Sequence, residues 1–325
     1  MSWLSAIDLA KRFMHLYESF PPSPHEETRD CMELIHHPVN IGSRELFLLK
    51  LAQWCYDDER NFPWDLYFGT DLIPFLTKMN VLEVGCSAGG RSKAWIERYK
   101  FSSYTGMDIK QTILQAAKRF VKHVDIETNF CAAKAEDLPF SDETFDAILS
   151  FQVFEHVQNV QHALSECHRV LKRQGRLFIV LPGHFHPLAH HLLAVTRTPC
   201  IHYFFSGKTL IKAYDEIIRE RGDDALWYRR KSCDLESWER GHQINGVTHA
   251  QFRKYINNNW RIIRHSRKPI GSIGRNSSKR KIYKMISNLF LPLVLVPFAN
   301  EIFLHRITYI LEKKPTDSCS PGLTP

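Results

Sequence analysis

A short apolar run that ends in small residues constrains the fold of this chain more than any other segment. The run Asn80–Val84 is too short for a helix and is followed by Gly85, Ser87 and Gly89. Short apolar runs of this kind are typical of buried strands, and glycine lets a ligand lie against bare backbone. Residues 91–99 are compatible with a helix, whose first free amide groups would point toward the same place. The segment therefore predicts a strand, a nucleotide-binding turn and a helix.

Strand and helix patterns alternate from residue 80 to residue 182. Strands are predicted over 80–84, 103–108, 128–134, 145–151 and 176–181, and helices over 91–99, 110–122 and 160–173. Such alternation predicts crossover connections between parallel strands. In sheets of this kind, ligands bind at the carboxyl ends of the strands. We therefore predict an α/β fold with a doubly wound, Rossmann-like sheet, in which Glu83, Asp108 and Phe151 lie near the ligand-binding edge.

Asp108 ends the second predicted strand, where a carboxylate is expected to accept both hydroxyls of a ribose. A glycine turn with such a carboxylate does not distinguish a dinucleotide from S-adenosylmethionine. The chain reads Gly85-x-Ser87-x-x-Gly90, with serine where a dinucleotide fingerprint requires the glycine that admits a pyrophosphate. The pattern therefore argues against a dehydrogenase.

Six segments resemble, in order, those of one known family. They are Leu82–Gly90, Gly106–Asp108, Ala135–Phe140, Phe145–Ile148, Phe154–Val157 and Arg169–Leu177. They are similar to segments of the class I S-adenosylmethionine-dependent methyltransferases, particularly the type-11 group. The resemblance covers roughly residues 80–182, and it implies a seven-stranded sheet, S-adenosylmethionine as methyl donor and methyl transfer as the reaction. None of the six segments implies an acceptor.

The resemblance also implies which residues hold the donor. The implied donor-binding residues are Glu83, Gly85, Cys86, Ser87 and Gly89 for the methionine portion, Asp108 and Ile109 for the ribose and one face of the adenine, Ala135, Glu136 and Asp137 for the adenine edge, and Phe151 and Gln152 for the methyl-transfer opening. The alternative is a structural turn with surface carboxylates.

Methyl transfer from a sulfonium is an in-line displacement with a neutral leaving group. The protein therefore contributes mainly by orienting the acceptor and excluding water, and a base is needed only for a poor nucleophile such as an alcohol. His156 follows the fourth strand, and His184 and His186 follow the fifth, so these three are the candidate bases. A structural role stays open for each.

The histidines do not predict a metal site. His156 ends the segment Gln152-x-x-Glu155-His156, and some related methyltransferases bind a divalent metal with an acidic residue where this chain has Gln152. Hard cations prefer several anionic oxygens, so the glutamine argues against a metal. The five histidines from His184 to His202 have few carboxylates near them and predict a polar wall for the acceptor. We therefore predict no metal.

Charge and cysteine usage indicate the setting of the protein. Lysine and arginine exceed acidic residues by eight, which weakly favours an anionic partner or surface. The eight cysteines show no CxxC spacing, as is typical of reduced intracellular thiols. The first residues contain no signal-peptide core. We predict a cytoplasmic protein and make no prediction of its oligomeric state.

A basic segment precedes an apolar one near the C-terminus. Nine lysines and arginines lie between residues 261 and 284, and residues 289–299 are continuously apolar with two prolines. The apolar run is well short of the ~20 residues that a membrane-spanning helix needs. We predict peripheral contact with an anionic membrane through 261–299, or an access route for a lipophilic acceptor. A buried loop or a contact between copies of the chain is the alternative.

Two helices are predicted N-terminal to residue 80. They either cover the edge of the sheet, close the donor site or have only a packing role. The helix over 43–56 directs Phe47, Leu51, Trp54 and Cys55 inward. The helix over 5–20 has one apolar face, formed by Leu9, Phe13, Leu16, Tyr17 and Phe20.

The predicted organisation has five parts. They are an N-terminal helical cap at 1–78, the donor-binding core at 79–182, an acceptor-covering insertion at 183–247, the C-terminal end of the core at 248–314 with a basic and apolar insertion at 269–300, and a disordered tail at 315–325. The predicted function is methyl transfer to a small-molecule, glycan or lipid-linked acceptor, at oxygen. The alternatives are an RNA or protein methyltransferase and a methyltransferase-like binding module without catalysis. Nucleic acid is disfavoured because the basic residues adjoin an apolar run and do not alternate with stacking aromatics.

Overall fold

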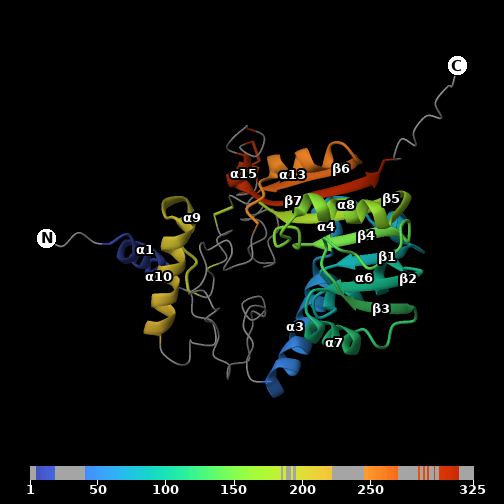
Figure 1. Cartoon of the computed structure of the whole chain (residues 1–325), viewed down its shortest axis with the longest axis horizontal. Helices are drawn as coiled ribbons and strands as arrows, with labels where there is room; N and C mark the ends of the chain where they lie inside the picture. The colour runs from blue at the N-terminus through green and yellow to red at the C-terminus, as the bar shows by residue number, and fades with distance from the viewer. Residues whose placement is uncertain are drawn as a thin grey trace.

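A seven-stranded sheet forms the centre of the computed structural model (Figure 1). The structure describes residues 5–18, 41–183, 186–187, 192, 195–221, 245–269, 285, 288–289, 291–292, 296 and 300–314. The strands are β1 (Asn80–Val84), β2 (Ser103–Asp108), β3 (Glu127–Ala132), β4 (Phe145–Phe151), β5 (Leu171–Pro182), β6 (Trp260–Pro269) and β7 (Leu304–Lys313). Their order across the sheet is β3-β2-β1-β4-β5-β7-β6. The predicted α/β, Rossmann-like sheet of seven strands is confirmed.

The direction of the last strand decides what reaches the ligand-binding edge. Strands β1 to β5 pair in parallel, whereas β7 is antiparallel to both β5 and β6. Arg306, near the start of β7, is therefore paired with Pro182, the last residue of β5. The antiparallel strand thus brings its first residues to the edge where the parallel strands end.

Helices cover both faces of the sheet. They are α3 (Ile41–Asn61), α4 (Asp65–Phe68), α5 (Ile73–Leu76), α6 (Gly90–Tyr99), α7 (Gln111–Phe120), α8 (Val160–Val170), α13 (His249–Ile256) and α15 (Asn300–Phe303). Because strand side chains alternate between the two faces, Leu82 packs in the core with residues of α8 and α13. Val81 packs in the other core, with α4, α5 and α6, where the rings of Trp64 and Trp95 lie 4.3 Å apart. Both faces of the sheet are therefore buried.

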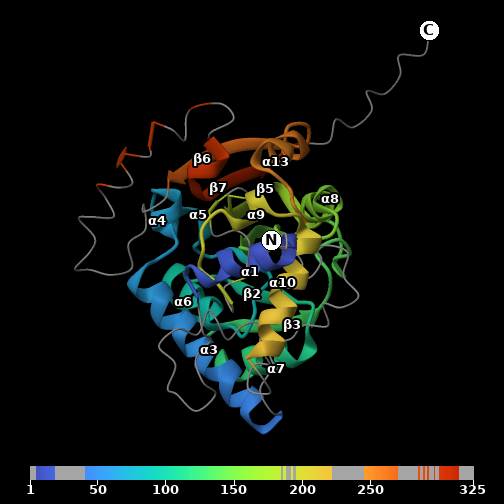
Figure 2. The same cartoon turned by 90° about the vertical axis from the view of Figure 1, so that its left-hand side faces the viewer.

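Three helices form a separate cluster on the side where the parallel strands end (Figure 1). They are α1 (Ala6–His15), α9 (Ile201–Phe204) and α10 (Gly207–Glu220). Helix α1 lies against α10 (Figure 2), and the Lys11 Nζ is 3.3 Å from the Glu216 carboxylate. The predicted apolar face of this first helix is wrong: Ala10 and Met14 are buried, whereas Leu9 is 41% exposed. The face that packs against α10 is therefore the one with Ala10 and Met14, and the face with Leu9 is turned toward solvent.

Several predictions lie outside the described residues. They are the tail at 315–325, residues 222–244 of the predicted insertion, and most of the segment 270–299. The helix predicted over 160–173 ends earlier, at Val170, because β5 already begins at Leu171. The last turn of α8 matters for the site because Arg169 there contacts the loop before β4.

Candidate active site

The loop between β1 and α6 is held in a conformation that favours glycine. Gly85 and Gly89 both have φ of 82°, and Ser87 between them also has a positive φ of 50°. The amides of Gly85 and Cys86 donate to the carbonyl of Met107 at 2.8 and 2.9 Å, which ties the loop to the end of β2. A side chain at either glycine would be strained, because L-residues rarely adopt this region. The predicted turn is therefore built as the sequence indicates.

A cleft lies beside this loop. It is lined by Leu51, Ala52, Cys55, Glu83, Gly85, Cys86, Ser87, Ala88, Gly90, Arg91 and Phe151. The structure thus brings together four of the residues predicted for the methionine portion and Phe151 of the predicted opening. Gly89 is not on the wall; it stands at the N-terminus of α6. Helix α3 supplies the opposite wall through Leu51 and Cys55, which both point inward as predicted.

Glu83 supplies a buried acid to the cleft. Its side chain accepts hydrogen bonds from the Ser92 hydroxyl at 2.7 Å and from the Tyr104 hydroxyl. Burial outweighs these bonds and raises the pKa of Glu83 to about 7. A buried carboxyl of this kind is stabilised in its charged form by a cationic ligand. The cleft therefore fits a ligand that carries positive charge next to an aliphatic chain.

Asp108 is the last residue of β2, the strand next to β1. One carboxylate oxygen accepts from the Ser87 amide at 3.2 Å and the other from the Lys110 amide at 3.3 Å. Burial raises the pKa of Asp108, against the effect of these backbone donors. Ile109 beside it is 61% exposed, which is unusual for a large apolar side chain at the end of a buried strand. The pair presents hydrogen-bond acceptors and an apolar surface side by side, as a nucleoside requires.

The three residues predicted for the adenine edge differ in their surroundings. Ala135 is buried, and the amide of Asp137 donates to the Lys134 carbonyl at 3.1 Å. Glu136 instead accepts from the amides of Gln158 and Asn159, at 2.8 and 3.2 Å. The carboxylate of Glu136 thus binds the chain just before α8, a structural role that the sequence did not indicate.

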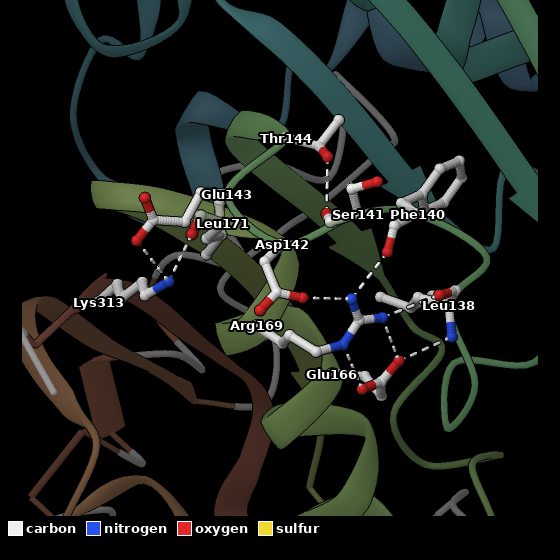
Figure 3. Close-up of polar contacts among 10 residues, drawn as sticks. All are labelled: Leu138, Phe140, Ser141, Asp142, Glu143, Thr144, Glu166, Arg169, Leu171 and Lys313. Carbon is white, nitrogen blue, oxygen red and sulfur yellow. Dashed lines mark hydrogen bonds and ion pairs between the residues drawn. The ribbon is translucent and has the colours of Figure 1, made fainter.

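Arg169 fixes the loop that follows the adenine-edge residues (Figure 3). From α8 its guanidinium donates to the carbonyls of Leu138 and Phe140, at 2.9 and 2.7 Å, and pairs with Glu166 at 2.7 Å. Glu166 in turn accepts from the Leu138 amide at 3.0 Å. The sequence predicts no role for Arg169 beyond its place in the resembling segment Arg169–Leu177. The available signal was the helical spacing of Glu166 and Arg169, which places both side chains on one face of α8.

Arg91 is a second residue that sequence reasoning missed. Its guanidinium lies over the Phe151 ring, 4.2 Å from the centroid, and within 3.7 Å of the carboxylates of Asp58 and Glu59 on α3. Burial raises the pKa of Glu59 to about 7. The signal in the sequence was a cation in the first turn of a helix, where the helix dipole disfavours it. Partners in α3 compensate, so Arg91 links that helix to the wall of the cleft.

The predicted methyl-transfer opening leads to a polar edge. Gln152 has φ of 56° and its amide donates to the Val180 carbonyl at 2.9 Å. His156 follows in the next turn, where its amide donates to the Val153 carbonyl at 2.8 Å. His186 follows β5, and burial lowers its pKa to about 4. The structure thus places His156 and His186 at the same edge, while His184 lies outside the described residues.

Neither a metal site nor a membrane-spanning helix is present in the described part of the chain. No three histidine, cysteine or acidic side chains there are grouped so as to hold a metal ion. No helix among the same residues is long and apolar enough to cross a membrane.

Comparisons with known proteins agree with this geometry. Residues 82–179 match the model of a methyltransferase domain. A fatty-acid O-methyltransferase of Mycolicibacterium smegmatis is 29% identical over 119 residues, which are 37% of this chain and 43% of the relative. A phthiotriol/phenolphthiotriol dimycocerosates methyltransferase of Mycobacterium tuberculosis is 32% identical over 111 residues, 34% of this chain and 40% of the relative. A demethylmenaquinone methyltransferase of Thermotoga maritima is 31% identical over 110 residues, 34% of this chain and 46% of the relative.

The matched part is limited in extent. The chain spans less than half the length of these curated relatives. Among solved structures, the MccD protein is similar over 79% of this chain and 97% of its own, with 18% sequence identity and a TM-score of 0.46.

Proposed function

We propose that this chain, a class I S-adenosylmethionine-dependent methyltransferase whose methyl donor is S-adenosylmethionine, acts on an oxygen of a lipid-linked or lipophilic small-molecule acceptor. The main support for donor binding is that Glu83, the loop after β1 and Phe151 line one cleft, at the carboxyl ends of β1 and β4. Support for the acceptor comes from the relatives, whose names include a fatty acid and a dimycocerosate.

The chain's own residues account for donor binding. Glu83 provides negative charge for the cationic end of the methionine portion, and Asp108 provides two carboxylate oxygens for the ribose hydroxyls. Ile109 offers an apolar face to the adenine. S-adenosylmethionine, when bound, supplies a methyl group on a positively charged sulfur. Phe151, held by Arg91, borders the opening and limits the access of water to that methyl group.

On the acceptor side, His156 and His186 are our proposed polar contacts. With a pKa near 4, His186 is uncharged at neutral pH, so its ring can accept a hydrogen bond without adding charge to the edge. His184 stays a prediction from the sequence.

Peripheral membrane contact is part of the same proposal. Met285, Leu289, Leu291 and Val296 are exposed apolar residues in the segment that follows the basic strand β6. Exposed apolar side chains next to basic residues favour an anionic lipid surface. A protein that collects its acceptor from a membrane would need such a surface.

Transfer of labelled methyl groups tests the proposal. Purified protein is incubated with methyl-labelled S-adenosylmethionine and separate lipid, glycan, RNA and protein fractions. We expect label in the lipid fraction, and much less label in the same reaction with the Asp108→Asn variant at a donor concentration that does not saturate the variant. Label in RNA or protein instead would overturn the acceptor. Failure of the unaltered chain to bind S-adenosylhomocysteine in calorimetry would overturn the donor site.

A further inference from the structure

Glu155 is a buried acid whose carboxylate has no hydrogen-bond partner in the part of the chain that the structure describes. Both of its carboxylate oxygens are inaccessible to solvent, and neither accepts a hydrogen bond from the residues that the structure describes. Buried polar groups in native proteins are nearly always satisfied, and an unsatisfied one costs about 1–3 kcal/mol or more. Such a group therefore calls for an explanation through a ligand.

The backbone around Glu155 is held firmly in place. Asn245 donates from its side-chain amide to the carbonyls of Phe154 and Val157, at 2.6 and 2.8 Å. Its own backbone amide donates to the Glu155 carbonyl at 2.8 Å. Three bonds from one residue fix the turn, so the unsatisfied carboxylate is not the result of a loosely held segment.

This turn also lies directly against the donor loop. A Cβ atom at Gly85 would collide with the side chain of Val153, which belongs to the same turn as Glu155. Phe151, four residues before Glu155, lines the donor cleft. Glu155 therefore belongs to a segment that lies against the donor loop and begins at the donor cleft.

Charged and titratable groups from the ends of β4 and β5 and the start of β7 are linked to this carboxylate, directly or through one another. His156 on the same turn and Arg306 at the start of β7 both interact with it electrostatically. Arg306 also acts on His186 after β5, and His202 of α9 does so as well. The ring of His186 stacks on that of His305, 5.1 Å between centroids. Glu155 is the only carboxylate among these groups.

We propose that Glu155 is the general base of the reaction and that the acceptor atom is a hydroxyl oxygen, an inference that rests on the proposed function. The hydroxyl oxygen attacks the methyl carbon of the donor while the carbon–sulfur bond breaks, and the bonding pair stays on sulfur as a neutral thioether. The hydroxyl proton moves to the Glu155 carboxylate. The positive charge of the donor and the negative charge of the carboxylate disappear together, so atoms and charge balance.

Glu155 suits this role better than His186 does. Burial raises the pKa of Glu155 from its usual range, toward the pH at which a base acts most effectively. Burial and Arg306 instead lower the pKa of His186 to about 4, which makes its ring a weaker base than an unperturbed histidine. His186 remains a neutral hydrogen-bonding group for the acceptor.

The test compares two acceptors that differ in their need for a base. Hexadecan-1-ol requires removal of a proton, whereas hexadecanoate is already an anionic nucleophile. In the Glu155→Gln variant we expect transfer to hexadecan-1-ol to fall by about 100-fold or more, the usual contribution of a general base. Transfer to hexadecanoate should change only a few-fold. Glu127→Gln, at an exposed position of β3, is the matched control and should leave both rates unchanged.

The outcomes distinguish a failure of the role of Glu155 from a failure of the proposed acceptor. Equal rates on hexadecan-1-ol for the variant and the unaltered chain, or activity of the unaltered chain on hexadecanoate alone, would overturn the role of Glu155. Activity of the unaltered chain on neither compound would overturn the proposed lipid acceptor itself. Binding of S-adenosylhomocysteine by Glu155→Gln shows that the variant is folded, and if it is not, Glu155→Asp replaces it. The shorter carboxylate is expected to retain part of the rate on the alcohol.

Discussion

Replacing Glu83 by glutamine is expected to stabilise the protein more at pH 8 than at pH 5.5. Burial raises the pKa of Glu83 from 4.5 to about 7. Between these two values the folded chain binds more protons than the unfolded chain, so the free energy of unfolding falls as the pH rises. Glutamine has no proton to lose and keeps an oxygen for the hydroxyls of Ser92 and Tyr104. The variant therefore avoids the cost of ionising a buried acid.

The size of the effect follows from the shift in pKa. Ionisation of Glu83 opposes folding by about 3 kcal/mol at pH 8 and by about 1 kcal/mol at pH 5.5. The gain of Glu83→Gln over the unaltered chain should thus be larger by about 2 kcal/mol at pH 8. Changes in hydrogen bonding add a constant that cancels between the two pH values. Other buried acids, such as Glu59, cancel as well because both proteins contain them.

Urea unfolding at the two pH values measures this difference. Free energies of unfolding are obtained from tryptophan fluorescence for the unaltered chain and for Glu83→Gln. The comparison requires that the slope of the free energy of unfolding against urea concentration is the same for both proteins. Glu127→Gln provides the matched loss of one exposed carboxylate, and its effect is subtracted. A difference between variant and unaltered chain that is the same at both pH values, or larger at pH 5.5, would refute the reasoning.

Three further changes test other parts of the site. Asp108→Asn should weaken S-adenosylhomocysteine binding at least tenfold in calorimetry, because hydrogen bonds to a charged group contribute about 1.5–3 kcal/mol each; unchanged affinity would contradict the ribose assignment. Arg169→Met should lower the free energy of unfolding by about 2 kcal/mol and weaken the same ligand, whereas Arg173→Met, at a side chain 87% exposed, should do neither; equal effects of the two would refute a role in holding the loop. Burial lowers the pKa of His249 to about 3, so the unfolded chain takes up a proton there as the pH falls below 6.5 and stability is lost. His249→Gln should therefore remove about 2 kcal/mol of the loss in unfolding free energy between pH 7.5 and pH 5, and an unchanged loss would show that this residue does not titrate on unfolding.

The donor side could be predicted because its signals are local. Gly85 and Asp108 stand at strand ends and Gly89 at the start of a helix, and these boundaries are visible in the apolar pattern of the sequence. Backbone dihedrals and the carboxyl edge of a parallel sheet then place them together. By contrast, Arg169 acts on carbonyl groups about 30 residues away in the chain, at Leu138 and Phe140. Backbone acceptors have no sequence signature, so this contact was not foreseeable.

The face of α1 and the direction of β7 depended on contacts over longer distances. Leu9 was expected to be buried, but a helix with apolar residues on several sides turns toward whichever partner it meets, and α10 meets Ala10 and Met14. The apolar pattern of β7 is the same for a parallel and an antiparallel strand. Only its pairing with β5 brings Arg306 to the acceptor edge.

Buried acids along one edge of the sheet lower the stability of the folded protein and favour the binding of a cationic donor. Burial raises the pKa values of Glu83, Asp108 and Glu155. Each carboxylate therefore opposes folding at neutral pH. A cationic donor recovers part of that energy on binding, and transfer of the methyl group removes the donor's sulfonium charge. Because Glu83 is proposed to meet the cationic donor, its carboxylate favours the charged substrate over the neutral thioether product. The same burial that destabilises the empty chain then helps to release the product.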